Sequence, residues 1–242
     1  MEEIKTQAIV LSATEYKESG KYLTLFSLES GIVKAKIQGV VKPKAKLAFA
    51  SLPFCFGEYI VVSKTGNTVI NCSAIDSFYD ITKDFDRFVA GESMLEVVSI
   101  IGRENEPNPE LFIMLLKALK MLAYSKSAPL AVLIKFLIFA LGNAGYGLKL
   151  EGCVKCGNKK PAKEFFSFDL GARVCSTCSD ESSVGLSAGE VAVLRNIDQT
   201  DIENLENLKF SSFENVVGVV KLLTKYFFHK TGEVVGAVDS YV

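Results

Sequence analysis

The chain has 242 residues, with 27 Lys and Arg against 28 Asp and Glu, one His, six Cys and no Trp. Hydrophobic residues make up 49% and charged residues 23%, which is typical of a folded globular protein and excludes a disordered, collagen-like or disulfide-stapled chain. A formal net charge of -1 argues on its face against a nucleic-acid partner, although a sum does not tell where the charges lie.

The N-terminal sequence carries two acids where a secretory signal needs basic residues, so we expect a cytoplasmic protein. The most apolar stretch, residues 128–148, is interrupted by Lys135, whereas a spanning helix needs about 20 apolar residues. We therefore expect a buried core helix there and no membrane partner. In a reducing compartment the cysteines are expected to be free or metal-bound rather than paired in disulfides.

Residues 1–80 predict a small β-barrel. Apolar and polar residues alternate, or β-branched residues run together, in segments separated by polar or Gly-bearing turns. The expected strands cover residues 4–11, 21–28, 32–40, 54–62 and 68–75. Short strands in this number suit a closed barrel of the OB or SH3 kind, because closure removes exposed strand edges. Cys55 and Cys72 fall in apolar strands, and we expect both to be small buried residues.

From residue 81 the hydrophobic period becomes helical. We expect helices over residues 81–103, 109–124 and 128–144, the second capped by Asn108 with Pro109 in its first turn. Ser187 with Glu190, and Ser211 with Glu214, have capping-box spacing and predict two more helices, the last ending near His229. His229 is better explained by a helix C-terminus or by exposure than by catalysis.

Residues 149–183 are rich in loops and contain four of the six cysteines. They form two C-x2-C pairs, separated by 18 residues: Cys153 with Cys156, and Cys175 with Cys178. Two such turns can each present two thiolates at about 2.3 Å from a tetrahedral metal, and Gly157 follows the first pair where a permissive backbone is needed. We expect one structural Zn with no open coordination position. A dithiol redox centre, an iron centre or a lost metal is the alternative.

With one His and no Walker loop, G-x-S-x-G or G-x-G-x-x-G motif, the chain contains no complete catalytic set, and we expect a protein that is not an enzyme. A redox enzyme built on the C-x2-C pairs is the hypothesis that would overturn this.

The charges are segregated along the chain. Residues 76–110 contain nine acids against three bases, whereas residues 149–178 contain six bases against three acids. Between Ser30 and Gly57 there are five lysines and no acid. Lys34 and Lys36 fall on the polar face of the expected third strand, and the following loop holds Lys42, Lys44 and Lys46. Such a face suits a nucleic-acid backbone, and the alternative is a solvated strand beside a lysine-rich loop.

Aromatic residues near this strand could stack with unpaired bases. Tyr22 and Phe26 share a strand face, and Tyr16 is expected in the loop before it. Aromatic residues on a small barrel are more often part of its core, and this interpretation stays beside the first.

The order of a small barrel, helices and an inserted four-cysteine segment resembles the RecO family of bacterial recombination mediators. The likeness lies in residues 16–26 (YKESGKYLTLF), Gly31, residues 39–44 (GVVKPK) with Lys46, residues 52–54 (LPF), and residues 145–148 (GYGL) before Cys153. The expected fold is α+β. It comprises an N-terminal OB-fold barrel (1–80), a helical domain (81–148 and 184–242) and an inserted four-cysteine zinc module (149–183).

The resemblance implies a mediator of DNA repair and homologous recombination that binds single- and double-stranded DNA and promotes strand annealing. With RecR, it would help load RecA onto DNA coated with single-strand-binding protein. It implies Lys42, Lys44 and Lys46 as DNA contacts, to which the face argument adds Lys34 and Lys36. It also implies zinc ligands at Cys153, Cys156, Cys175 and Cys178, and a cytoplasmic, nucleoid-associated location.

This basic loop carries lysine where the family has more arginine, so we expect salt-sensitive binding that is independent of sequence. The alternative is a protein-interaction scaffold with incidental DNA affinity, which the acidic helices would suit.

Overall fold

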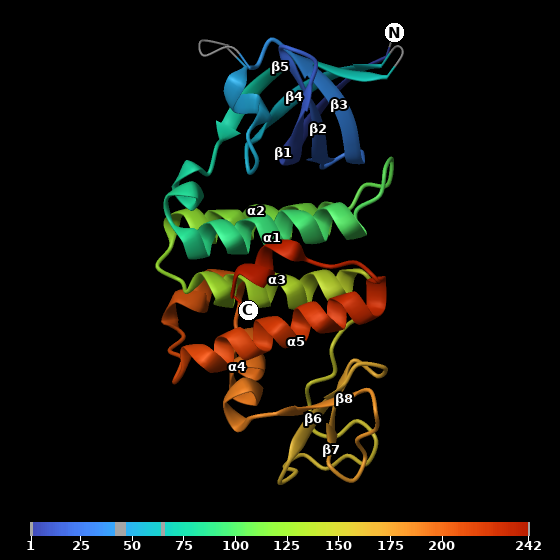
Figure 1. Cartoon of the computed structure of the whole chain (residues 1–242), viewed down its shortest axis with the longest axis vertical. Coiled ribbons are helices and arrows are strands. Elements are labelled where there is room, and N and C mark those ends of the chain that lie inside the picture. Colours follow the sequence, from blue (N-terminus) through green and yellow to red (C-terminus); the bar gives the residue numbers. More distant parts are fainter. Residues whose placement is uncertain (1, 42–46, 64–65, 242) are drawn as a thin grey trace. The chain divides into compact units, whose positions relative to one another are not determined.

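The computed structural model describes residues 2–41, 47–63 and 66–241. The chain divides into two compact units, Met1–Tyr124 and Ser125–Val242 (Figure 1). The first unit contains the larger sheet and two helices, and the second contains three helices and a small sheet. The sequence predicts domain boundaries at residues 80, 148 and 183. The division into two units does not test whether those segments are independent domains, so the boundaries stay a prediction.

The first unit is built on a closed five-stranded barrel with strand order β1-β2-β3-β5-β4. Its strands are β1 (Glu2–Tyr16), β2 (Gly20–Ser27), β3 (Gly31–Gln38), β4 (Phe56–Ser63) and β5 (Asn67–Asp76). Neighbouring strands are antiparallel except β3 and β5, which pair in parallel. The barrel confirms the predicted OB-type architecture, and a short 3-10 helix (Ala48–Ser51) precedes β4.

β1 extends beyond the predicted strand, which ended at Leu11. Its first part pairs with β4 and its second part with β2, and the register shifts between Val10 and Ser12. A bulge of this kind bends a strand so that it can serve two neighbours of a closed barrel. The prediction relied on the β-branched run of residues 4–11, and the strand continues beyond the bulge to Tyr16.

The barrel core is formed by the inward residues of all five strands, including Val10, Leu25, Ile37 and Val69. Cys55 and Cys72 lie in this core, as predicted. Burial raises the pKa of the Cys55 thiol, and it raises that of the Cys72 thiol to about 12. Both cysteines are therefore poor nucleophiles at neutral pH, because the thiolate is the reactive form.

Two helices cover part of the outer face of the barrel. They are α1 (Phe85–Ile101) and α2 (Pro109–Tyr124), preceded by a 3-10 helix (Tyr79–Lys83). Asn108 caps α2 as predicted, since its Oδ1 accepts a hydrogen bond from the N–H of Leu111 at 3.1 Å. The Phe112 ring of α2 packs against Phe26 and Phe56 of the barrel, with centroids 5.6 and 6.1 Å apart.

The second unit contains α3 (Pro129–Asn143), α4 (Ala188–Gln199) and α5 (Phe213–Thr231). α3 packs against the other two and is buried along most of its length, which confirms the predicted core helix. The capping box of α4 is also confirmed: Ser187 Oγ accepts from the N–H of Glu190 at 3.1 Å, and Glu190 Oε2 accepts from the N–H of Ser187 at 2.8 Å. The predicted cap of α5 is wrong by one residue, because Ser212 rather than Ser211 accepts from the N–H of Glu214.

The small sheet of the second unit consists of β6 (Glu164–Ser167), β7 (Ala172–Cys175) and β8 (Ser183–Leu186), in the order β7-β6-β8. Two 3-10 helices, Ile202–Asn207 and Gly236–Tyr241, complete the unit. Among the helices of the described ranges, none has both the length and the apolar character that crossing a bilayer requires.

Candidate metal centre and nucleic-acid interface

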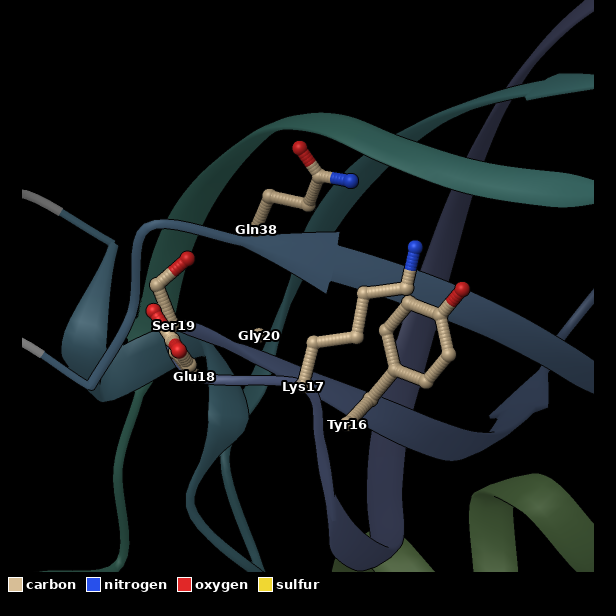
Figure 2. Close-up of a pocket in the computed structure, with 6 residues that line it drawn as sticks. All are labelled: Tyr16, Lys17, Glu18, Ser19, Gly20 and Gln38. Carbon is tan, nitrogen blue, oxygen red and sulfur yellow. The ribbon is translucent and has the colours of Figure 1, made fainter.

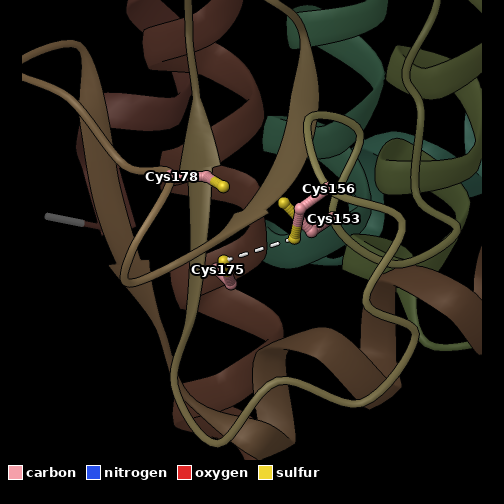
Figure 3. Close-up of side chains that lie close together, drawn as sticks. All are labelled: Cys153, Cys156, Cys175 and Cys178. Atoms are coloured by element: carbon pink, nitrogen blue, oxygen red, sulfur yellow. Dashed lines mark hydrogen bonds between the residues drawn. The ribbon is translucent and has the colours of Figure 1, made fainter.

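Four cysteines converge in the second unit, as their spacing predicts. Cys153 and Cys156 lie in the loop before β6, Cys175 ends β7, and Cys178 lies in the turn after it. The Sγ atoms of these cysteines all lie within 4.8 Å of one another, and the side chains point into one common space (Figure 3). The cluster could therefore hold a metal ion.

Each pair is held by backbone hydrogen bonds within its own turn. In the first turn the N–H of Gly157 donates to the carbonyl of Cys153 at 2.8 Å, and the N–H of Cys153 donates to the carbonyl of Asn158 at 2.8 Å. In the second, the N–H of Cys178 donates to the carbonyl of Cys175 at 3.0 Å. Gly157 has φ +74°, a conformation that suits glycine and explains its place after the first pair.

The distances suit a tetrahedral metal better than a disulfide. Cys156 Sγ and Cys175 Sγ are 3.8 Å apart. A tetrahedron with metal–sulfur bonds of about 2.3 Å has edges of about 3.8 Å, whereas bonded sulfurs lie about 2.05 Å apart.

The electrostatics of the cluster also favour a cation. Burial alone would raise the pKa of Cys153, but backbone N–H groups that point at its sulfur, led by that of Cys156, lower it to about 6. The neighbouring Cys175 thiol raises the pKa of Cys178. Four sulfurs this close cannot all carry a negative charge without compensation, and a bound metal ion would supply it.

Two ion pairs support the cysteine turns. Lys155 Nζ donates to Asp180 Oδ2 and to the carbonyl of Cys178, both at 2.9 Å, and so links the two turns. Arg173 of β7 is 2% exposed, pairs with Glu164 of β6 and donates to the carbonyl of Leu150. Arg173 thereby joins the sheet to the chain segment that leads to Cys153.

The two predicted DNA contacts on β3 both face outward. Lys34 is 68% exposed at its side chain, and its Nζ lies 2.9 Å from Glu104 Oε1 in the loop between α1 and α2. Lys36 Nζ lies 5.2 Å from the centre of the Tyr16 ring and 5.6 Å from that of Tyr22. The other predicted contacts, Lys42, Lys44 and Lys46, lie outside the described residues.

The aromatic residues considered for base stacking have three different environments. Phe26 is fully buried under α2, so it belongs to the core and cannot reach a base. Tyr22 shares its strand face but is 41% exposed. Tyr16 was expected in a loop. It is instead the last residue of β1, where it pairs with Gly20. The Tyr16 and Tyr22 rings meet edge to face, with centroids 4.4 Å apart.

Two residues of this face escaped the sequence prediction. Lys17 Nζ lies 5.2 Å from the centre of the Tyr16 ring, and its position next to Tyr16 in a hairpin turn was the available signal. Glu104 carried no local signal, because only the tertiary fold brings it to Lys34.

His229 is exposed near the end of α5, where its Nε2 lies 3.0 Å from Asp169 Oδ1.

Two known protein families match this sequence, and together their matches extend over both units. The family described as "Recombination protein O N terminal" matches residues 1–78, and "Recombination protein O C terminal" matches residues 82–228.

Similar curated proteins carry the name DNA repair protein RecO. That of Acetivibrio thermocellus is 30% identical over 214 residues, covering 87% of this chain and 85% of the relative. That of Caldicellulosiruptor saccharolyticus is 29% identical over 231 residues, covering 93% and 92%. That of Pelotomaculum thermopropionicum is 34% identical over 175 residues, covering 72% and 68%.

Proposed function

The chain belongs to the RecO family, which gives it a role in DNA repair and recombination, and we propose that it acts as a mediator that binds single- and double-stranded DNA without turnover chemistry. The DNA backbone lies along the outer face of β2 and β3, against Lys34 and Lys36, and it also contacts Lys42, Lys44 and Lys46. The observation that carries the proposal is the placement of Lys34 and Lys36 on the outer face of β3, where the Lys34 side chain is 68% exposed.

The binding mode follows from the chemistry of these side chains. Lysine ammonium groups neutralise phosphates and release counterions, and they do not read bases. A strand held by its backbone keeps its bases free to pair with a second strand, so binding of this kind promotes annealing. The helical parts supply surfaces for RecR and for single-strand-binding protein, and through these partners the chain helps load RecA. This activity belongs to the cytoplasm, at the nucleoid.

We further propose that the four cysteines bind one Zn²⁺ as a structural ion. Thiolate sulfur suits zinc, and four protein ligands leave no coordination position open for a substrate. When bound, zinc neutralises the thiolates and cross-links the two turns. Lys155, Asp180, Arg173 and Glu164 hold those turns in place around it.

The test is a titration of the full chain with single- and double-stranded oligonucleotides over a salt series. We expect the logarithm of the affinity to fall linearly with the logarithm of the salt concentration, by about 0.7 per phosphate contact on a single strand. Complementary oligonucleotides should anneal faster with the protein present. Absence of binding at low salt, or an affinity that does not depend on salt, would overturn the proposal.

A protein-interaction scaffold with incidental DNA affinity is the second candidate. It is favoured by the acidic segment of residues 76–110, where Tyr79 is 62% exposed. A titration in which DNA binds weakly and annealing is unchanged would favour this alternative.

A further inference from the structure

A partly exposed cluster of tyrosines and lysines lies at the end of the barrel where β1 turns into β2. It consists of Tyr16, Lys17, Tyr22 and Lys36, and we call it the tyrosine platform. The two rings are in contact, Lys36 Nζ lies over both, and Lys17 Nζ lies over Tyr16. No backbone phosphate contact requires aromatic rings, so this feature is not explained by the binding mode proposed above.

The strand register explains why these side chains share one face. Thr14 pairs with Tyr22, so Tyr16 lies two residues further along the same side of β1. Tyr22 in turn pairs with Lys36 across the β2–β3 ladder. Because side chains alternate along a strand, all three project from the outer surface of the barrel. The hairpin turn then places Lys17 next to the Tyr16 ring.

An open hollow of about 510 Å³ adjoins the platform, lined by Tyr16, Lys17, Glu18, Ser19, Gly20 and Gln38. Figure 2 shows the Tyr16 ring and Lys17 on one side of it and Glu18 and Ser19 on the other. Gly20 contributes no side chain to the floor, and a Cβ there would lie 2.9 Å from the carbonyl oxygen of Ile37.

The ammonium groups of Lys17 and Lys36 lie at the rings, and the carboxylate of Glu18 lies on the other side of the hollow. The charge beside the rings therefore suits an anionic ligand with an aromatic face. The two tyrosines raise the pKa of Lys36, which favours its positively charged form. Ser19 and Gln38 add neutral hydrogen-bonding groups to the hollow, which can pair with the edge of a base. A nucleotide combines an aromatic base with a phosphate, which matches rings flanked by two ammonium groups.

We propose that the tyrosine platform is a base-stacking site for an unpaired nucleotide of single-stranded DNA, with Lys17 and Lys36 binding the phosphates on either side of that base. The inference rests on the proposed DNA binding and adds a selectivity to it. A base inside a duplex is stacked on its neighbours and cannot reach the rings. The platform thus favours single strands, whereas the lysines elsewhere on the barrel hold either form.

The experiment compares an oligothymidine with an abasic oligonucleotide of the same length and charge. Stacking on an aromatic side chain contributes about 1–3 kcal/mol per base, which corresponds to roughly 5- to 150-fold in affinity. Wild-type protein should bind the oligothymidine more tightly by a factor within this range. Tyr16→Ser should lose most of that preference while keeping its affinity for the abasic strand, and Tyr16→Phe should retain it.

Tyr79→Ser is the matched control, because Tyr79 is exposed in the same unit and also has a lysine, Lys83, 5.1 Å from its ring centre. It should leave the preference unchanged. If Tyr16→Ser impairs folding, Tyr22→Ser gives the same test from the second ring. Equal affinity of the wild type for both strands would overturn the platform and leave the proposed function intact. Binding to neither strand would instead contradict the proposed function.

Discussion

Glu104 Oε1 lies 2.9 Å from Lys34 Nζ, so the loop between α1 and α2 places an acid against a lysine of the barrel face that we propose binds DNA. Backbone contacts fix this position. The N–H of Ile32 donates to the carbonyl of Arg103 at 2.9 Å, and Glu104 forms isolated β-bridges with Gly31 and Ile32 of β3. A phosphate that approaches Lys34 must compete with the carboxylate of Glu104.

Replacing this acid should strengthen DNA binding. We expect Glu104→Gln to raise the affinity for single-stranded DNA about two- to fivefold at low salt, because it removes a competing charge worth up to about 1 kcal/mol in an exposed pair. Folding stability should change little for the same reason. Fluorescence anisotropy with a labelled oligonucleotide measures the effect.

Glu58→Gln provides the control for net charge. Glu58 forms an exposed ion pair of the same length, 2.9 Å, with Lys5, but between β4 and β1. The Glu58→Gln substitution removes the same charge from the same barrel, but from a strand that neither carries Lys34 nor pairs with the strand that does. An equal gain in both variants would show that Glu104 acts only through the overall charge.

Gly31 should be intolerant of any side chain. It has φ +65°, and a Cβ there would lie 2.3 Å from the carbonyl oxygen of Glu106 and 2.5 Å from that of Arg103. Gly31→Ala therefore combines left-handed strain of about 1–2 kcal/mol with displacement of the loop that carries Glu104. Gly39 has φ +71° with nothing within 4 Å of its Cβ position, so Gly39→Ala carries only the strain.

Thermal unfolding of the two glycine variants should thus show a clearly larger loss of stability for Gly31→Ala. Equal losses would mean that the close approach of the α1–α2 loop to β3 does not stabilise the fold.

The six cysteines should react in two classes. With zinc bound, we expect no rapid modification by a thiol reagent, and about one zinc per chain by elemental analysis. A chelator should expose four reactive thiols, those of Cys153, Cys156, Cys175 and Cys178. Cys55 and Cys72 should react only after denaturation, since both are buried in the barrel. Rapid reaction of the four before chelation, without metal in the sample, would contradict the zinc proposal.

Local patterns in the sequence were sufficient for much of this structure. The alternation along residues 21–28 predicts β2, and the C-x2-C spacing predicts the cysteine cluster, because both depend on chemistry within a few residues. Ser187 with Glu190 likewise predicts the start of α4. For α5, Ser211 and Ser212 are adjacent in the sequence. The spacing to Glu214 predicted Ser211 as the cap, whereas Ser212 is the cap in the structure.

What the sequence did not reveal depends on contacts between distant segments. Phe26 and Tyr22 look equivalent on one strand face, and only the packing of Phe112 separates a core residue from an exposed ring. The pairing of Glu104 with Lys34 joins residues on different elements, so no local pattern announces it. The second half of β1 was missed for a different reason: it pairs with the adjacent β2, but residues 12–16 lack the β-branched run of residues 4–11.

The central claim is that lysines of the barrel hold the DNA backbone, and the salt dependence of binding tests it most directly. We compare a variant with Lys34, Lys36, Lys42, Lys44 and Lys46 changed to Gln with a control of equal charge change. The control replaces five lysines of the second unit: Lys159, Lys160, Lys163, Lys221 and Lys225. Thermal unfolding verifies that both variants are folded.

If each barrel lysine neutralises one phosphate, the slope of log affinity against log salt should become shallower by up to about 3.5 in the barrel variant, for every oligonucleotide sequence alike. The control should keep most of the wild-type slope. An unchanged slope in the barrel variant, or an equal loss in both, would contradict the proposal that the barrel face binds DNA.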